Sequence, residues 1–291
     1  MIVSKNYNKK NIFMAINDKF YYEITPPKKL VNINLPEIWR FRDLLYIFVW
    51  RDIKVRYKQT AIGVIWAIFQ PLFTMLIFTV FFGRLAKMPS DGVPYPIFVY
   101  AGLLLWNYFS VALTNASDSL VANESIVKKV YFPRLILPLS TTVTPVIDFL
   151  LALVVLFGLM AFYHFVPNLI GIILMPFLLL ISLLSAWGLG VFLASVNVKF
   201  RDVRHALPFF IQLMLFLTPV IYPVSLIPAK YQWIVYLNPM SGVIQTARTS
   251  LLGSGPVDWG ILFISFAISL ALVAGGIYYF RKTERFFADV L

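Results

Sequence analysis

Residues that could do covalent chemistry are almost missing from this sequence. It has no cysteine, which excludes disulfides, thiolate nucleophiles and cysteine metal sites. Its two histidines, His164 and His205, have no partner at metal-ligand spacing, and we interpret them as polar residues at segment ends. No glycine is followed by lysine, so the phosphate-binding loop G-x-x-x-x-G-K-[ST] is absent, and no two aspartates have D-x-D spacing. The sequence predicts no catalytic, cofactor-binding or metal-binding residues, and no enzyme.

One acidic residue, Asp148, falls inside a long apolar stretch. A carboxylate in a lipid bilayer is costly and usually has a function. Asp148 could bind a proton or a cation, line a substrate path, or form a structural hydrogen bond to a neighbour such as Thr144. Because no basic residue shares its span, we favour a structural or path-lining role over ion coupling.

The composition indicates what surrounds these residues. Of 291 residues, 60% are hydrophobic and 13% are charged, whereas a soluble domain carries about 25% charged residues. A membrane-spanning helix needs about 20 mostly apolar residues. The candidate segments are 61–82, 97–117, 139–163, 168–195, 206–223 and 258–280. The predicted fold class is all-α, a polytopic membrane protein with six transmembrane helices, the fourth of which tilts or breaks near Pro176 or Gly188–Gly190.

The basic residues predict the orientation of these spans. If the N-terminus is cytoplasmic, 21 of the 25 lysines and arginines fall on the cytoplasmic side, and only Arg84, Lys87, Lys230 and Arg248 lie outside. Positive charge accumulates on the cytoplasmic side of membrane proteins. We therefore expect a multi-pass protein of the cytoplasmic (inner) membrane with both termini inside. The net charge of +12 then reflects topology and contact with membrane lipids, and not nucleic-acid binding.

Three regions follow from this reading: a cytoplasmic arm (1–38), an amphipathic interfacial helix (39–60) and a transmembrane domain (61–291). In the second region we expect aromatic and aliphatic residues on one stripe and basic residues opposite. The stripe comprises Tyr46, Val49, Trp50, Ile53 and Tyr57, and the basic side comprises Arg51, Lys54 and Lys58. Such a pattern is typical of a helix lying on a membrane, although a solvated helix packed on the protein is the alternative.

Between the last two predicted spans, residues 223–257 predict two short helices on the outer side. Pro228 can open the first, Asn238–Pro239 the second, and Gly253 can end it. Each helix is apolar yet too short to span a membrane. We interpret the pair as a re-entrant or gate-like element, with interfacial packing as the alternative. Its candidate gate residues are Trp233, Tyr236, Asn238 and Pro239.

Two inner loops, 117–138 and 197–203, mix charge with apolar residues, which indicates docking of a partner or anchoring at the membrane interface. Aromatic residues form two further stripes inside predicted spans. They are Trp66, Phe69 and Phe73 in the first span and Phe209 and Phe216 in the fifth. Aromatic faces stack on sugar rings, so the set could line a glycan path, whereas packing is the more frequent role of any single ring.

The order of several motifs is similar to that of a known family. Gln70-Pro71 lies in the first span, and KVYFPRLILPLS, NVKFRDVRH, TPVIYP, LNPM and RFFADVL begin at residues 129, 197, 218, 237 and 285. Over residues 40–291 the chain resembles the permease subunit of ABC exporters for lipid-linked polysaccharides, which handle O-antigen, capsule and teichoic acid. The resemblance is closest to O-antigen permeases.

The resemblance implies six spans, a homodimer, and two copies of a separate ATPase that binds ATP and Mg. The substrate would be an undecaprenyl-linked polysaccharide, and helices at 228–252 would form an outer gate. Residues in both inner loops would couple to the ATPase: Glu124, Ser125, Lys128, Lys129, Arg134, Lys199, Arg201, Asp202 and Arg204. The lipid head would meet four basic residues of the interfacial helix: Arg51, Lys54, Arg56 and Lys58.

Three other functions remain open at this point. An exporter of drugs or small molecules could share the architecture, because a fold does not fix a substrate. An ion-coupled flippase would depend on Asp148 and work without ATP. A membrane-bound transferase is the least supported, because its catalytic residues are missing.

Overall fold

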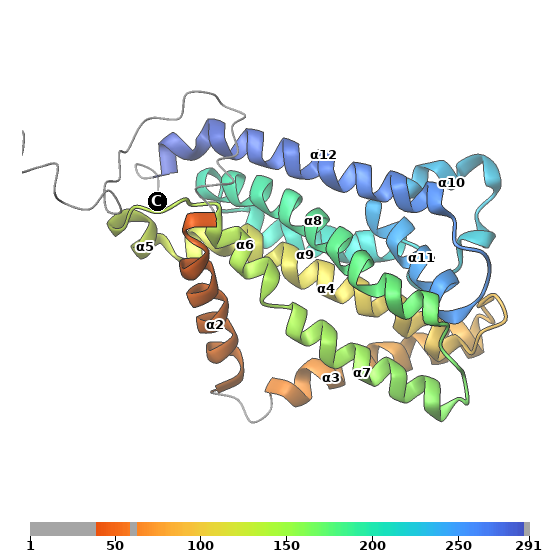
Figure 1. Ribbon diagram of the computed structural model, residues 1–291. Coiled ribbons are helices and arrows are strands. Elements are labelled where there is room, and N and C mark those ends of the chain that lie inside the picture. The colour runs from red at the N-terminus through yellow and green to blue at the C-terminus, as the bar shows by residue number, and fades with distance from the viewer. Residues whose placement is uncertain (1–38, 59–62, 288–291) are drawn as a thin grey trace, which may run out of the picture. The chain divides into compact units, whose positions relative to one another are not determined.

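The computed structural model describes residues 39–58 and 63–287, and every regular element within them is helical (Figure 1). This confirms the all-α class for the described residues, and the predicted arm 1–38 lies outside them. The α-helices are α2 (Arg42–Lys58), α3 (Gly63–Phe78), α4 (Tyr95–Ala122), α5 (Glu124–Lys129), α6 (Ile136–Val143), α7 (Val146–Phe162), α8 (Leu169–Lys199), α9 (Val203–Leu217), α10 (Ala229–Tyr236), α11 (Pro239–Leu252) and α12 (Trp259–Thr283). A π-helix, η2 (Thr79–Leu85), continues α3, and η3 (Val224–Leu226) and η4 (Glu284–Phe286) are 3-10 turns.

Five segments of the described chain are long and apolar enough to cross a membrane: Ile65–Leu85, Tyr95–Ala122, Ile136–Phe162, Leu169–Lys199 and Trp259–Thr283. They coincide with five of the six predicted spans. The remaining segment, 206–223, corresponds to α9, which ends at Leu217 after 15 residues and is shorter than the roughly 20 residues that a span needs. The expected helix to residue 223 is therefore wrong, and the sixth span stays a prediction.

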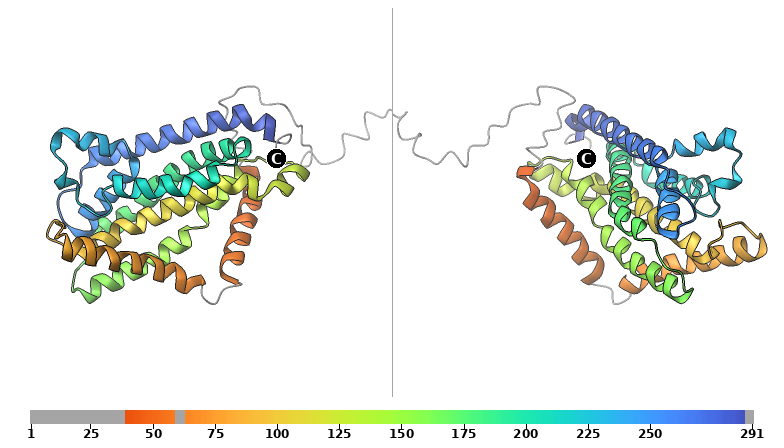
Figure 2. Two further views of the ribbon diagram at one scale, coloured as in Figure 1. Left: turned by 180° about the vertical axis from the view of Figure 1, so that it is seen from behind. Right: turned by 45° about the vertical axis from the view of Figure 1, so that its right-hand side comes forward.

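The helix α4 forms the centre of the bundle. Most of its side chains are buried, and it packs against α8, α11, α6, α7 and α3. We call the end with α2, α5 and η4 the basal end, and the end with η2, α10 and α11 the distal end (Figures 1 and 2). A helix this buried fixes the places of the elements around it.

Small residues let the long helices approach closely, as is common where helices pack in membranes. A Cβ at Gly190 would collide with Ala116 of α4, and one at Gly276 of α12 would collide with the backbone of Gly188 in α8. Beside the second contact, the hydroxyls of Ser185 and Ser269 are hydrogen-bonded at 2.8 Å. The pairs α4–α8 and α8–α12 therefore form the tightly packed part of the bundle.

The breaks in the helices differ from those expected. The segment 139–163 was expected to be one helix, but it is interrupted between Val143 and Val146, where α6 ends and α7 begins next to Pro145. Proline removes a backbone donor and clashes with the preceding turn, which explains the interruption. The fourth span, by contrast, is one continuous helix through Pro176 and Gly188–Gly190, so no break occurs there.

At the basal end, apolar side chains from six helices and the C-terminal segment meet in one cluster, which we call the basal cluster. Its members include Phe48, Leu120, Val127, Leu137, Val191, Phe280 and Phe287. The rings of Phe280 and Phe287 make an edge contact with centroids 5.2 Å apart. The basal cluster therefore joins the ends of the spans to α2 and α5.

The two short helices predicted on the distal side are present. α10 follows Pro228, and the side chain of Asn238 accepts a hydrogen bond from the amide of Met240 at the start of α11. Gly253 ends α11 with a left-handed φ of 65°, which glycine adopts without steric cost. α11 is buried against α8, α12 and α4, whereas α10 has no buried residue.

A buried arginine holds α11 in this position. The guanidinium of Arg248 donates to the carbonyls of Phe98 at 3.0 Å and Pro219 at 2.7 Å, and also to that of Val220. Its Cζ lies 3.6 Å from the centroid of the Phe98 ring. Arg248 thereby ties α11 to α4 and to the bend after α9.

We expect Arg248→Met to destabilise the protein strongly. The change removes the donor to the carbonyls of Pro219 and Val220, which lie outside any helix, and each buried unpaired group costs about 1–3 kcal/mol. Thermal unfolding of the purified protein in detergent measures the loss, and Lys230→Met, which removes an exposed cation from the same end, serves as the control. Equal melting temperatures for both variants would contradict this role of Arg248.

Candidate functional site

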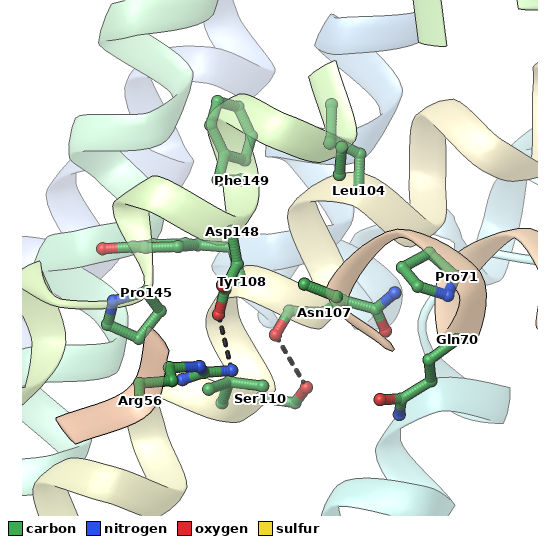
Figure 3. A pocket seen from close by; sticks show the side chains of 13 residues that line it. Arg56, Gln70, Pro71, Leu104, Asn107, Tyr108, Ser110, Pro145, Asp148 and Phe149 are labelled. Carbon is green, nitrogen blue, oxygen red and sulfur yellow. Dashed lines mark hydrogen bonds and ion pairs between the residues drawn. The ribbon is translucent and has the colours of Figure 1, made fainter. Parts of the chain in front are cut away.

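A polar cleft lies between α2, α4 and the α6–α7 break, and α3 closes part of it. It comprises two cavities that share Arg56, one of about 100 Å³ and one of about 460 Å³. The smaller cavity extends to Gln70 and Asn107 (Figure 3). The larger one extends to Asp118 and Asn123 at the basal end of α4. Below we call both cavities together the polar cleft.

Asp148 lies in the wall of the polar cleft, in the first turn of α7. Its carboxylate pairs with Arg56 of α2, with Nη2 and Oδ2 2.6 Å apart (Figure 3). It also accepts a hydrogen bond from the Tyr57 hydroxyl. Burial, and next the hydrogen bond to Asp148, raise the pKa of Tyr57 above its ordinary value, so its hydroxyl stays protonated and donates. The suggested bond from Thr144 to Asp148 is not the one seen, because Thr144 donates to the carbonyl of Ser140.

The sequence analysis found no basic residue in the same span as Asp148. The basic partner of Asp148 is Arg56, which belongs to α2. Part of this contact could be anticipated, because the sequence analysis had already placed Arg56 and Tyr57 on a helix next to the first span. What the sequence could not give was the packing of α2 against α6, which brings Arg56 and Tyr57 to the first turn of α7. The pairing makes Asp148 a contact between two elements that are far apart in the sequence.

The predicted helix at 39–60 is present as α2, but its faces differ from the prediction. Its buried residue is Phe48, which packs in the basal cluster with its ring centroid 5.9 Å from that of Phe132. Tyr46 and Trp50 are exposed and stacked, which leaves them available to a membrane surface. One face of α2 therefore packs on the protein, as the alternative reading held, while an aromatic face stays outside.

The four basic residues proposed for the lipid head are not equivalent. Arg51 pairs with Asp52 at 2.8 Å, and Arg56 pairs with Asp148. Lys54 lies with its Nζ 5.1 Å from the Trp50 ring, so it shares the aromatic side, and the prediction that it lies opposite is wrong. Lys58 is exposed at the end of α2. Two of the four charges are thus already compensated within the protein.

The first inner loop contains the predicted short helix, α5. Lys128 donates to Glu124 at 2.6 Å, and this hydrogen bond lowers the pKa of Glu124. Ser125, Lys128 and Lys129 are exposed. Arg134 is different, because its Nη1 donates to the carbonyl of Glu284 at 2.7 Å and its guanidinium lies 5.9 Å from the Phe287 ring. It therefore binds the C-terminal segment.

The second inner loop exposes Lys199, Phe200, Arg201 and Asp202. Two residues that the sequence analysis did not single out as site residues, Asn197 and Asp118, connect this loop to α4. The buried Asn197 donates to Asp118 Oδ1 at 3.0 Å and to the carbonyl of Ser117, and Arg204 lies 3.8 Å from Asp118 Oδ2. The sequence feature that could have pointed to them is that both are polar residues near the end of a long apolar segment. Through Asp118 the second loop is joined to the helix that leads to the first.

The proposed glycan-path aromatics are all exposed. Trp66, Phe69 and Phe73 form a continuous series on α3, with successive centroids 6.2 Å and 5.5 Å apart. On α9, Phe209 packs edge-on against Phe210, and Phe216 is exposed near the end of the helix. Exposed rings can face lipid or a second subunit as well as a glycan, so the path stays a prediction.

The proposed gate residues differ in their surroundings. Trp233 is exposed on α10, and Tyr236 is half-buried. Asn238 Nδ2 donates to Thr218 Oγ1 at 2.8 Å, and Pro239 is buried. Asn238 and Pro239 therefore anchor α11, whereas the exposed α10 is the part of the pair that a partner or substrate can reach.

These features define a class: a multi-pass, all-helical membrane protein with exposed loops at one end and a polar cleft beside them. The family model described as ABC-2 type transporter matches residues 43–252, and the chain belongs to this family. The resemblance inferred from the motifs is thereby confirmed.

Individual relatives show which transporters of this family the chain is similar to. The chain is 29% identical to an O-antigen export system permease protein RfbA of Klebsiella pneumoniae, over 86% of this chain and 95% of that protein. It is 30% identical to the protein of that name from Myxococcus xanthus, over 85% of this chain and 96% of the relative. The polysialic acid transport protein KpsM of Escherichia coli is 24% identical over 80% of this chain and 91% of its own length.

The pair of Arg56 and Asp148 predicts a measurable coupling. We expect Arg56→Asp and Asp148→Arg each to lower the melting temperature, and the double variant to recover part of the loss. Contacting residues commonly show coupling energies of about 0.5–3 kcal/mol. Thermal unfolding in detergent supplies the cycle, and the exposed pair Arg42 and Asp43 supplies a control cycle with little coupling. Additive losses at Arg56 and Asp148 would show that the pair does not hold α2.

Proposed function

We propose that this chain is the channel-forming permease subunit of an ABC transporter that exports a polysaccharide across the cytoplasmic membrane. The observation that carries the proposal is the similarity to O-antigen permeases over more than nine-tenths of their length. The helical fold supports it, because five segments of the described chain can cross a membrane, and the sequence lacks the phosphate-binding loop G-x-x-x-x-G-K-[ST] that the proposed ATPase partner would supply.

In this proposal the energy comes from a partner. Two copies of the permease form the channel, and two copies of an ATPase bind ATP and Mg beside it. The distribution of lysine and arginine supports a cytoplasmic basal end with both termini inside. There α5 and the loop at Lys199–Asp202 expose charged side chains, and these would dock on the ATPases.

The docking loops can pass movement to the spans because they are fixed to them. Val127 of α5 packs in the basal cluster, and Asp118 and Asn197 connect the second loop to α4. A displacement of either loop by the ATPase therefore reaches α4, which contacts most of the bundle. Arg134 contributes by holding the C-terminal segment against the first loop.

The substrate is an undecaprenyl-linked polysaccharide of the O-antigen kind in this proposal. Lys54 and Lys58 are the basic residues of α2 without a carboxylate partner among the described residues, so they are best suited to meet the lipid diphosphate. Exposed rings on α3 and α9 would line the glycan path, and α10 with α11 would form the outer gate. The engagement of Asp148 by Arg56 disfavours an ion-coupled flippase.

Reconstitution with the ATPase encoded for the same transporter tests the proposal. We expect proteoliposomes to move lipid-linked glycan only with ATP, and the double change Lys128→Ala and Lys129→Ala in α5 to abolish most of this export. Lys230→Ala, at the distal end, is the control and should export normally. If no ATPase associates and transport follows a proton gradient instead, the permease assignment is wrong.

A further inference from the structure

Three carboxamide side chains in the polar cleft have no hydrogen-bond partner among the described residues. Gln70 of α3 and Asn107 of α4 line the smaller cavity, and Asn115, two turns further along α4, lines the larger one. The Asn107 amide points toward the side of the cleft where Gln70 and Pro71 lie (Figure 3). Each amide offers both a donor and an acceptor.

These amides are available to a polar occupant. Gln70 is exposed and Asn107 and Asn115 are half-buried, and all three lie on helices that are candidate spans and line the cavities. The larger cavity, of about 460 Å³, falls within the ~300–1,000 Å³ typical of small-molecule sites. It has room for more than the few waters that two or three amides would hold.

The charges of the cleft select the kind of occupant. Its five charged lining residues are two arginines and three aspartates, and each has an oppositely charged neighbour. The ion pairs are Arg51 with Asp52, Arg56 with Asp148, and Arg204 with Asp118. No surplus positive charge remains to bind a phosphate, so the cleft fits a neutral ligand with many hydroxyl groups.

We propose that the polar cleft binds a neutral saccharide segment of the exported polymer, with Gln70, Asn107 and Asn115 as its hydrogen-bonding residues. The inference rests on the proposed function and adds a sugar-binding site within one subunit. Hydroxyl groups both donate and accept hydrogen bonds, which matches the amides. The lipid diphosphate binds elsewhere, on the uncompensated lysines of α2.

Binding to two lipids tests this assignment. The purified transporter is titrated with undecaprenyl pyrophosphate alone and with the same lipid carrying a short fragment of the host's own polysaccharide. We expect Asn107→Leu and Asn115→Leu to weaken binding of the glycan-bearing lipid about 2- to 10-fold, the worth of one net hydrogen bond, and to leave the bare lipid unaffected.

A charged variant separates sugar from phosphate. Asn115→Asp keeps an acceptor and adds a negative charge, so it should retain most of the glycan-dependent affinity. If instead it weakens binding of both lipids equally, the cleft holds the diphosphate and the inference is wrong. Leucine variants that bind both lipids like the unmodified protein would also overturn it. The proposed function is tested by ATP-dependent export of the unmodified protein, which is a separate measurement. Failure of the binding test would therefore overturn the sugar site and not the proposed function.

The absence of cysteine allows a second measurement. Asn115→Cys should react with a water-soluble maleimide, and the glycan-bearing lipid should slow the reaction while the bare lipid does not. Val154→Cys, on an exposed apolar face of α7, is the control and should react slowly under all conditions. A cysteine at position 115 that stays unreactive, or that the glycan does not protect, would show that no saccharide enters the cleft.

Discussion

The distal half of the structure depends on one buried guanidinium. Arg248 reaches from α11 to carbonyls of α4 and of the bend after α9, and Phe98 covers its face. Gly102 makes this arrangement possible, because a Cβ there would collide with the guanidinium. α9 ends at Leu217 because Thr218 precedes Pro219 and is extended, with ψ of 138°, as is usual before a proline. The carbonyls of Pro219 and Val220 then accept hydrogen bonds from Arg248. Arg248 thus joins the bend after α9 and the helix α11 to the central helix α4.

Local patterns in the sequence predicted the elements well. Apolar length gave five candidate spans, and Pro228, Asn238 and Gly253 gave the ends of the two short distal helices. These features depend on residues next to one another in the chain. The break at Pro145 and the continuity of α8 through Pro176 could not be read this way, because tertiary packing decides whether a proline interrupts a helix in a bundle.

The candidate site was predicted less completely, since its contacts join distant segments. Arg56 was expected to face a lipid head and is instead paired with Asp148, 92 residues away in the chain. Arg134 was expected to face a partner and instead binds the C-terminal segment. Asp118 and Asn197 were not singled out as site residues, because the contact between them joins α4 to α8, 79 residues apart in the chain. Exposed residues of α5 fit the prediction best, since their position depends mainly on a local helix.

The contact of Gly188 with Gly276 sets a limit on how the bundle can move. At this point the backbones of α8 and α12 touch without side chains between them. An axial slip of one helix along the other by about 5.4 Å, one helical turn, would bring a side chain of the next turn against that backbone. We therefore expect α8 and α12 to move together as one unit, and conformational change to occur in the elements outside this contact, such as α2 and the interrupted pair α6 and α7.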